Sequence, residues 1–258
     1  MTRFFADRML DYQKGGLRMK AILASFGSRT HSAELETLQT KLSLRSPIET
    51  ESVHLSHITG RTTLEAAITD DSIIMPLLIQ KGYEYRRILS LGLPTGEPLL
   101  SSSDDIMRIA GILRKELERK AGRTYIFAAH GNKDERIAQY DELNETLPDD
   151  IRIITMQGPC RFPAENIMAA DEIILMPFLL TIGHHALIDM QEKVLPKLRR
   201  LCKQVSYVNK SILSLSTGFY EIFEDHFCRL LEELNLLPSI GREEDMLLQI
   251  KDSQSSLS

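Results

Sequence analysis

Short apolar runs alternate with helix-compatible stretches along most of this sequence, and the alternation limits the folds open to it. The first series predicts strands at 20–26, 52–55, 73–79 and 88–93, with helices after Ser32, at 62–68 and after Ser103 or Asp104. The second predicts strands at 124–129, 151–156, 172–180 and 204–208, with helices at about 134–146, 164–170, 186–203 and 218–236. Strands and helices that alternate in this way form parallel sheets covered on both faces. We therefore expect an α/β fold.

The two series also indicate how the chain is divided. Gly122 ends the long helix of the first series, because glycine readily adopts the left-handed conformation that closes helices. We expect an N-terminal α/β lobe at 19–122 and a C-terminal α/β lobe at 123–240, stacked with a cleft between them. The remaining segments are interpreted as an N-terminal extension at 1–18 and a polar tail at 241–258.

Composition and charge exclude several classes of protein. The net charge is −5 and no basic block is interleaved with aromatics, so neither nucleic acid nor a membrane is expected as a partner. No apolar run reaches the roughly 18 residues of a transmembrane helix. The three cysteines, Cys160, Cys202 and Cys228, are widely spaced. This spacing favours a reducing, cytoplasmic location over a disulfide framework or a zinc ribbon.

Polar side chains follow three consecutive strands of the second series. His130 follows the apolar run TYIFAA, Gln157 ends IRIITMQ, and His184 and His185 come soon after the strand at 172–180. Because ligands bind outside the carboxyl ends of strands in open α/β sheets, we expect these side chains at one edge of one sheet. Neutral imidazole is the commonest protein metal ligand and accepts protons near neutral pH. The pattern predicts a metal or proton-transfer site, against the alternative of unrelated polar loop residues.

Other residues carry weaker signals. Ser28 lies in a turn ahead of a predicted helix, where a helix N-terminus could hold an anionic group, but the turn has neither a GxGxxG nor a Walker pattern. Cys160 is interpreted either as a soft extra ligand or as a plain buried thiol. Asp189 is a candidate to orient a histidine, as metal-binding imidazoles usually require.

Four segments resemble a known family. They are KAILASFGSRT near the start, PLLSSSDD at 98–105, IFAAHGN at 126–132 and MPFLLTIGHHALIDM at 176–190. Together they resemble the anaerobic (class II) sirohydrochlorin cobaltochelatase of cobalamin synthesis, in the ferrochelatase-like superfamily. The resemblance implies two Rossmann-like lobes around a tetrapyrrole cleft, and insertion of a divalent metal without an organic cofactor. Co²⁺ is the expected metal substrate and Fe²⁺ or Ni²⁺ the alternatives, because affinity alone does not select cobalt.

The resemblance also implies roles for individual residues. His130 matches the histidine of the family's GHG motif, and His185 matches that of its GDHA motif, where both are metal ligands and proton acceptors. Gln157 stands where the family has a glutamate ligand; its amide oxygen can bind a metal but takes no proton. Contacts with the tetrapyrrole are expected for Ser28, Glu84, Tyr85 and His184.

Departures from the family pattern leave a second function open. Besides the change at Gln157, Leu78 stands where the family has a further histidine, ahead of the GDEY-like 82–85. The first hypothesis is an active chelatase. The second is a catalytically reduced relative that binds a tetrapyrrole or metal as carrier or sensor, and the third is an unrelated two-lobed binding protein. Candidates to pair with substrate carboxylates are Arg29, Arg86 and Arg87. The sequence leaves a homo-oligomer open.

Overall fold

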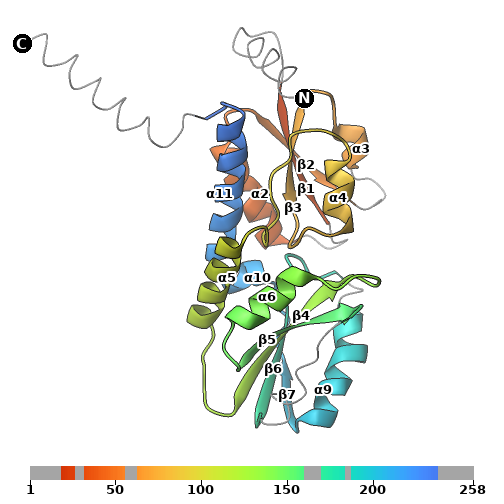
Figure 1. Ribbon diagram of the computed structural model, residues 1–258, viewed down its shortest axis with the longest axis vertical. Coiled ribbons are helices and arrows are strands. Elements are labelled where there is room, and N and C mark those ends of the chain that lie inside the picture. The colour runs from red at the N-terminus through yellow and green to blue at the C-terminus, as the bar shows by residue number, and fades with distance from the viewer. Residues whose placement is uncertain (1–18, 27–31, 56–62, 160–169, 184–186, 238–258) are drawn as a thin grey trace, which may run out of the picture.

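The computed structural model describes residues 19–26, 32–55, 63–159, 170–183 and 187–237, which form two parallel β-sheets flanked by helices (Figure 1). The strand orders are β2-β1-β3 and β5-β4-β6-β7. The strands are β1 (Lys20–Ser25), β2 (Glu49–His54), β3 (Ser72–Leu77), β4 (Arg123–Gly131), β5 (Ile151–Gln157), β6 (Glu172–Pro177) and β7 (Gln204–Tyr207). The helices are α2 (Ala33–Arg45), α3 (Leu64–Ala67), α4 (Tyr83–Leu89), α5 (Ser103–Glu116), α6 (Ala138–Thr146), the π-helical η1 (Asp189–Val194), α9 (Leu195–Leu201), α10 (Ile212–Leu215) and α11 (Gly218–Glu233). The expected α/β fold is confirmed.

The first sheet is covered on both faces because its strands β1 and β3 are buried at nearly every position. Successive side chains of a strand point to opposite faces. Ile22 and Ala24 of β1 therefore pack in one core with residues of α3 and α4. Ala21 and Leu23 join a second core that includes residues of α2 and α11.

One predicted strand of the first series is wrong. The sequence predicts a strand at 88–93, but Ile88 lies in α4, and the chain turns at residues 90 and 91. Ile88 and Tyr85, three residues apart, are the buried side chains of this helix. A short apolar run does not distinguish a strand from one buried face of a helix, and here the helical face is what the apolar residues form.

The segment at 94–100 lines the outer edge of β3. The backbone N–H of Ile74 donates to the Pro94 carbonyl oxygen at 2.8 Å, and that of Leu100 donates to Ile79 at 2.7 Å. These bonds satisfy backbone groups that an open strand edge would leave unpaired.

The central strand of the second sheet, β4, separates two cores. On one side Phe127 packs edge-on against Phe178, with ring centroids 6.1 Å apart, and Phe178 packs edge-on against Tyr140 of α6 at 6.0 Å. On the other side Ile126 and Ala128 lie in a core formed with η1 and α9. The strand is therefore apolar on both faces until it reaches its last residues.

The helix that covers this second face contains a π turn. The sequence predicts a helix at 186–203 that Pro196 kinks, and the structure has helical backbone from 187 to 201 with π geometry at 189–194. Proline lacks an N–H and crowds the carbonyl group four residues earlier. The N–H of Leu195 accordingly donates to the carbonyl of Met190, five residues back. The π turn thus lies directly before the turn that contains the proline.

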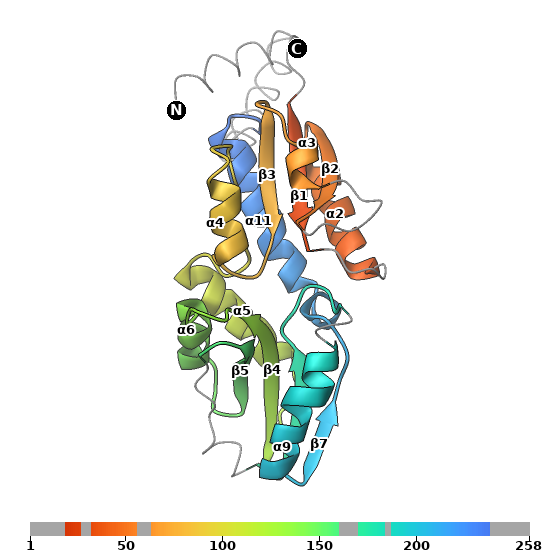
Figure 2. The same ribbon diagram turned by 90° about the vertical axis from the view of Figure 1, so that its right-hand side faces the viewer.

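Two segments carry the chain between the lobes. The first is α5, which leads from the first sheet into the second, and the second is α11, which returns and packs against α2 and α5 (Figures 1 and 2). Arg45 of α2 pairs with Glu224 of α11 at 3.1 Å, and Arg108 of α5 pairs with Asp225 at 2.8 Å. The last described helix therefore lies on the first sheet, although the expected C-terminal lobe at 123–240 includes it. The lobe boundaries stay a prediction.

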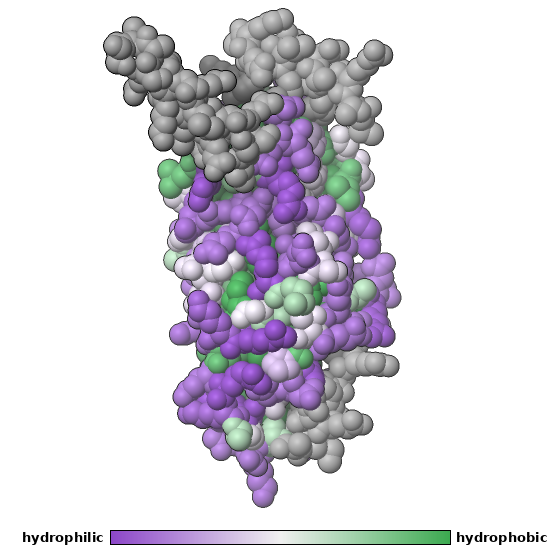
Figure 3. Space-filling view, turned by 60° about the vertical axis from the view of Figure 1, so that its left-hand side comes forward, coloured by the Kyte–Doolittle hydropathy of each residue, from purple (hydrophilic) through white to green (hydrophobic). Residues whose placement is uncertain are grey.

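The surface over α2, α5 and α11 is mostly hydrophilic, with small hydrophobic patches between the charged groups (Figure 3). Exposed apolar side chains on these helices include Leu44 of α2 and Met107 of α5, which are 82% and 58% exposed. Within the described ranges, no helix combines the length and the apolar character needed to cross a membrane.

Candidate functional site

The carboxyl ends of the two sheets face one another. Thr181, beyond the end of β6, donates its hydroxyl to the carbonyl oxygen of Phe26, beyond the end of β1, at 3.5 Å. Arg86 of α4 pairs with Glu135, in the loop after β4, at 2.9 Å. Because α4 follows β3, both contacts join the carboxyl edge of one sheet to that of the other. The edge at which the sequence predicts chemistry therefore lies between the lobes.

His130 lies at this edge. It is the next-to-last residue of β4, and its side chain is exposed, whereas the preceding residues from Thr124 to Ala129 are buried. By the alternation of the strand it belongs to the same face as Ile126 and Ala128, which is the face covered by η1 and α9. An exposed imidazole in this position is accessible to a metal ion or a proton from between the lobes.

Gln157 is the last residue of the neighbouring strand, β5, and is also exposed. It is paired in register with Gly131, so its position along the ladder is one residue beyond that of His130. Strand alternation then assigns Gln157 and His130 to opposite faces of the sheet. The two side chains share the open edge rather than one face, and the sequence alone did not reveal this offset.

Two glycines allow the ends of β4 and β5 to lie against each other. Gly131 and Gly158 have φ angles of 78° and 76°, a left-handed conformation that favours glycine. A Cβ atom on Gly158 would lie 1.6 Å from the carbonyl oxygen of Asn132, and one on Gly131 would lie 2.2 Å from that of Gln157. Backbone contact between the two loops therefore fixes where His130 and Gln157 sit.

Three predicted site residues, Ser28, His184 and His185, lie outside the described residues, as does Cys160. The flanks of the histidine pair are described: the N–H of Leu187 donates to the Gly183 carbonyl oxygen at 3.1 Å, and helical backbone starts at Leu187. This helix covers the same face of the second sheet to which His130 belongs. No group of three His, Cys, Asp or Glu side chains suited to a metal ion occurs within the described ranges. The roles of the two histidines stay a prediction.

The predicted substrate contacts of the first lobe, Glu84 and Tyr85, lie at the start of α4. Tyr85 is 5% exposed in the core that also contains Leu78. Burial, together with the charge and hydrogen bonding of Glu97, raises the pKa of Tyr85. Glu84 accepts a hydrogen bond from Arg87 at 2.7 Å. Tyr85 and Leu78 are thus core residues of the first lobe, and a contact between Tyr85 and a tetrapyrrole stays a prediction.

Asp189, expected to orient a histidine, pairs with Lys193 at 2.5 Å. The pair lies within the π turn, four residues apart. A role for Asp189 beside a metal-binding imidazole also stays a prediction.

A buried polar cluster joins α5 to α11, and the sequence did not predict it. Both ring nitrogens of His226 face acceptors: Nδ1 lies 3.2 Å from the Glu97 carbonyl oxygen, and Nε2 lies 3.0 Å from Asp105 Oδ1. Asp105 also accepts hydrogen bonds from the hydroxyl groups of Ser101 and Ser102, each at 2.7 Å. Ser102 is the N-cap of α5, so the helix begins slightly earlier than the start that the sequence predicts after Ser103 or Asp104.

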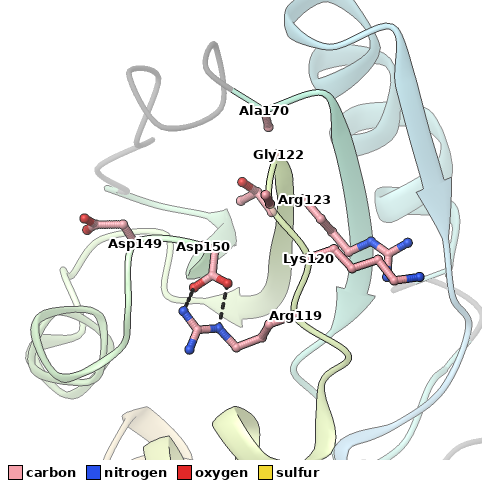
Figure 4. Close-up of a pocket in the computed structure, with 9 residues that line it drawn as sticks. Arg119, Lys120, Gly122, Arg123, Asp149, Asp150 and Ala170 are labelled. Carbon is pink, nitrogen blue, oxygen red and sulfur yellow. Dashed lines mark hydrogen bonds and ion pairs between the residues drawn. The ribbon is translucent and has the colours of Figure 1, made fainter.

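A pocket of about 430 Å³ opens at the opposite end of the second sheet (Figure 4). Its lining includes Arg119, Lys120, Gly122, Arg123, Asp149 and Asp150, where β4 and β5 begin. Arg119 donates two hydrogen bonds to Asp150, at 2.7 and 2.8 Å, and Arg123 donates one to Glu172 at 2.6 Å. Its arginines are thus engaged by carboxylates, and ligands of open α/β sheets bind at the other ends of the strands. We do not assign this pocket to the site.

A comparison with protein-family models matches residues 70–228 to the model described as cobalt chelatase (CbiK). The match covers more than half of the 258-residue chain and runs from just before β3 into α11. It therefore includes His130, Gln157, His184 and His185. No curated protein matches the sequence significantly.

Solved structures of chelatases are similar to this one. SirB from Bacillus subtilis with Fe³⁺ has a TM-score of 0.57 at 12% identity, over 83% of this chain and 96% of that one. The sirohydrochlorin chelatase SirB from Bacillus subtilis subspecies spizizenii in complex with cobalt has a TM-score of 0.54 at 13% identity, over 84% and 96%. CbiX, the terminal enzyme of siroheme biosynthesis in denitrifying bacteria, has a TM-score of 0.51 at 18% identity, over 82% and 99%. At these identities the likeness establishes the fold.

Proposed function

Because the chain belongs to the cobalt chelatase (CbiK) family, we propose that it inserts Co²⁺ into sirohydrochlorin in cobalamin synthesis. The family makes the chain a metal chelatase, an enzyme that places a metal ion in a tetrapyrrole. Our proposal adds the metal, the macrocycle and the pathway. One SirB structure contains cobalt and another contains Fe³⁺, so iron, as Fe²⁺, is kept as an alternative substrate in the test. Ni²⁺ is kept as well, because affinity alone does not select cobalt.

His130 and His185 are the proposed metal ligands and proton acceptors. The observation that carries this assignment is the exposed His130 at the end of β4, within the family match and at the edge that faces the other lobe. Insertion of a divalent ion releases two pyrrole protons from the free-base macrocycle. An imidazole can bind the incoming ion or accept a proton near neutral pH, so two histidines can serve both steps.

Gln157 is the proposed third ligand, through its amide oxygen. An amide is neutral and takes no proton, so proton acceptance falls on the histidines. A site with two imidazoles and an amide also leaves the charge of the metal ion uncompensated, which favours its transfer into a macrocycle that becomes a dianion when deprotonated. Ser28, Glu84, Tyr85 and His184 are proposed to contact the tetrapyrrole between the lobes.

A visible-absorbance assay tests the proposal. Wild-type protein and the His130→Ala/His185→Ala variant are mixed with sirohydrochlorin and Co²⁺, Fe²⁺ or Ni²⁺, beside a protein-free control. We expect spectral conversion well beyond one equivalent with wild-type protein and Co²⁺, and a rate at the protein-free level with the variant. Retained turnover in the folded double variant would contradict the assigned roles.

The same assay addresses the carrier or sensor function, which Gln157 and the buried Leu78 favour. A stoichiometric spectral shift without turnover would indicate that function. The Gln157→Glu variant then shows whether the amide in place of the family's glutamate limits the insertion rate. A large gain in insertion rate would show that the amide limits the reaction, whereas an unchanged rate would show that the histidines suffice.

A further inference from the structure

Arg86 of α4 reaches from the first lobe to the second. Its side chain is 52% exposed, and its Nη2 atom donates to Glu135 Oε2 at 2.9 Å. α4 starts after the carboxyl end of β3, and Glu135 lies in the loop after the carboxyl end of β4. The ion pair thus spans the two edges between which the substrate of a two-lobed chelatase would lie.

Glu135 is held beside the predicted metal ligand. Asn132, two residues after His130, donates its side-chain amide to the same oxygen, Glu135 Oε2, at 3.2 Å. The other side-chain atom of Asn132, Oδ1, accepts from the backbone N–H of Asp134 at 3.1 Å. The loop is therefore braced by Asn132, and the partner of Arg86 belongs to the segment that directly follows His130.

The neighbouring arginine is held differently. Arg87 donates to Glu84 at 2.7 Å and to Glu65 at 2.6 Å, and it is 30% exposed. Two carboxylates from its own lobe therefore neutralise Arg87. Of the arginines that the sequence offered as carboxylate partners and the structure describes, Arg86 is the one that faces the other lobe.

A carboxylate of a ligand can readily replace Glu135 as the partner of Arg86. Exposed ion pairs contribute little to stability, because both groups are well solvated when apart. An incoming carboxylate that forms two parallel hydrogen bonds with the guanidinium gains more than the single bond it replaces. Displacement of Glu135 by a carboxylate ligand therefore costs little.

We propose that Arg86 binds a peripheral carboxylate of the tetrapyrrole, and that Glu135 occupies Arg86 until this carboxylate displaces it. The inference rests on the proposed function for the identity of the macrocycle. It makes Arg86 a residue that selects carboxylate-bearing tetrapyrroles over esterified ones, and it makes Glu135 a competitor of the substrate.

Two substitutions with opposite effects test the exchange. Arg86→Gln removes the carboxylate partner and should raise both the Kd for metal-free sirohydrochlorin and the KM by about three- to tenfold, with kcat unchanged. Glu135→Gln removes the competitor and should lower Kd and KM. The double variant should behave as Arg86→Gln does. A matched control, Arg108→Gln, removes the exposed pair between α5 and α11 and should change none of these values.

Binding is measured by the absorbance shift of metal-free sirohydrochlorin, and KM and kcat by metal insertion. Methyl-esterified sirohydrochlorin should bind equally to wild type and Arg86→Gln. If the ion pair were merely a brace between the lobes, both single variants would weaken binding, and that result would overturn the inference. If Arg86→Gln raises the Kd and Glu135→Gln lowers it, but the wild type shows no turnover, the proposed function is contradicted and the inference is supported. If the wild type shows turnover but Kd and KM are unchanged in both variants, the inference is contradicted and the proposed function is supported. If the wild type binds no tetrapyrrole, both the inference and the proposed function are contradicted.

Discussion

Replacement of Asp105 by alanine should destabilise the protein more than replacement of any exposed charge. Asp105 is 3% exposed, and His226, its partner on α11, is 2% exposed. The carboxylate accepts from His226 at 3.0 Å, from the Ser101 hydroxyl at 2.7 Å, and from the hydroxyl and backbone N–H of Ser102 at 2.7 and 3.0 Å. Alanine would leave all of these donors, of which His226 is buried, without this acceptor.

The magnitude follows from the hydrogen bonds to this carboxylate. Asp105 accepts hydrogen bonds from three side chains, and a hydrogen bond to a charged group contributes about 1.5–3 kcal/mol. Because such contributions add only in part, we expect a cost of about 3–5 kcal/mol. Since each kcal/mol corresponds to roughly 2–4 °C in a protein of this size, Asp105→Ala should lower the Tm by about 6–20 °C. Urea unfolding at pH 7 measures the free energy directly. Asp225→Ala, next to His226 on α11, removes the exposed pair with Arg108 and should cost at most about 1 kcal/mol.

The loss of unfolding free energy caused by Asp105→Ala should also depend on pH. Burial raises the pKa of Asp105, but the hydrogen bonds from His226, Ser101 and Ser102 outweigh it and hold the pKa well below its usual range. The native state therefore binds this proton less readily than the unfolded state. The stabilisation is complete above the unfolded-state pKa, near 4, and is lost as the pH falls toward the native value. We expect the free energies of unfolding of wild type and Asp105→Ala to differ less at pH 3 than at pH 7. A loss below about 1 kcal/mol at pH 7, or a difference that widens in acid, would refute the reasoning.

Substitutions at four other positions test the packing around the site and the helices. Gly158→Ala should destabilise by about 2 kcal/mol or more in urea unfolding, because φ is 76° and the added Cβ would meet the Asn132 carbonyl oxygen. Gly111→Ala, on the exposed face of α5 with open space around it, should instead stabilise by about 0.5–1 kcal/mol; a loss there would contradict the helix assignment. Leu78→His should cost about 1–3 kcal/mol, because the position is 7% exposed in an apolar core. Pro196→Ala should raise Tm by relieving the π turn, and an unchanged or lower Tm would show that the proline is not its cause.

The sequence predicted the strands whose burial is continuous. The runs of β1, β3 and β4 are apolar on both faces, so their positions follow from composition, and alternation with helices required parallel sheets. The order β5-β4-β6 then confirms that the strands before His130, Gln157 and Gly183 are neighbours. The sequence predicts a strand at Ile88 where the structure has a helix, because three or four apolar residues suit either structure.

What the sequence could not supply is contact between distant segments. The register that pairs Gln157 with Gly131 depends on how two strands slide against each other, and no local pattern fixes it. Arg86 and Glu135 are 49 residues apart, and each alone resembles any surface charge. No local pattern around His226 indicates its acceptors, because they come from a different segment of the chain.

The return of α11 to the first sheet has a consequence for synthesis of the chain. A ribosome releases β1, β2 and β3 early, but the helix that covers one of their faces is made more than a hundred residues later. Domains generally fold in the order in which they are made. Here the second lobe, whose elements are contiguous from β4 to β7, can close before the first lobe does. One face of the first sheet is therefore only partly covered, by α2, until Gly218–Glu233 emerges. The half that begins the polypeptide is the half that is completed last.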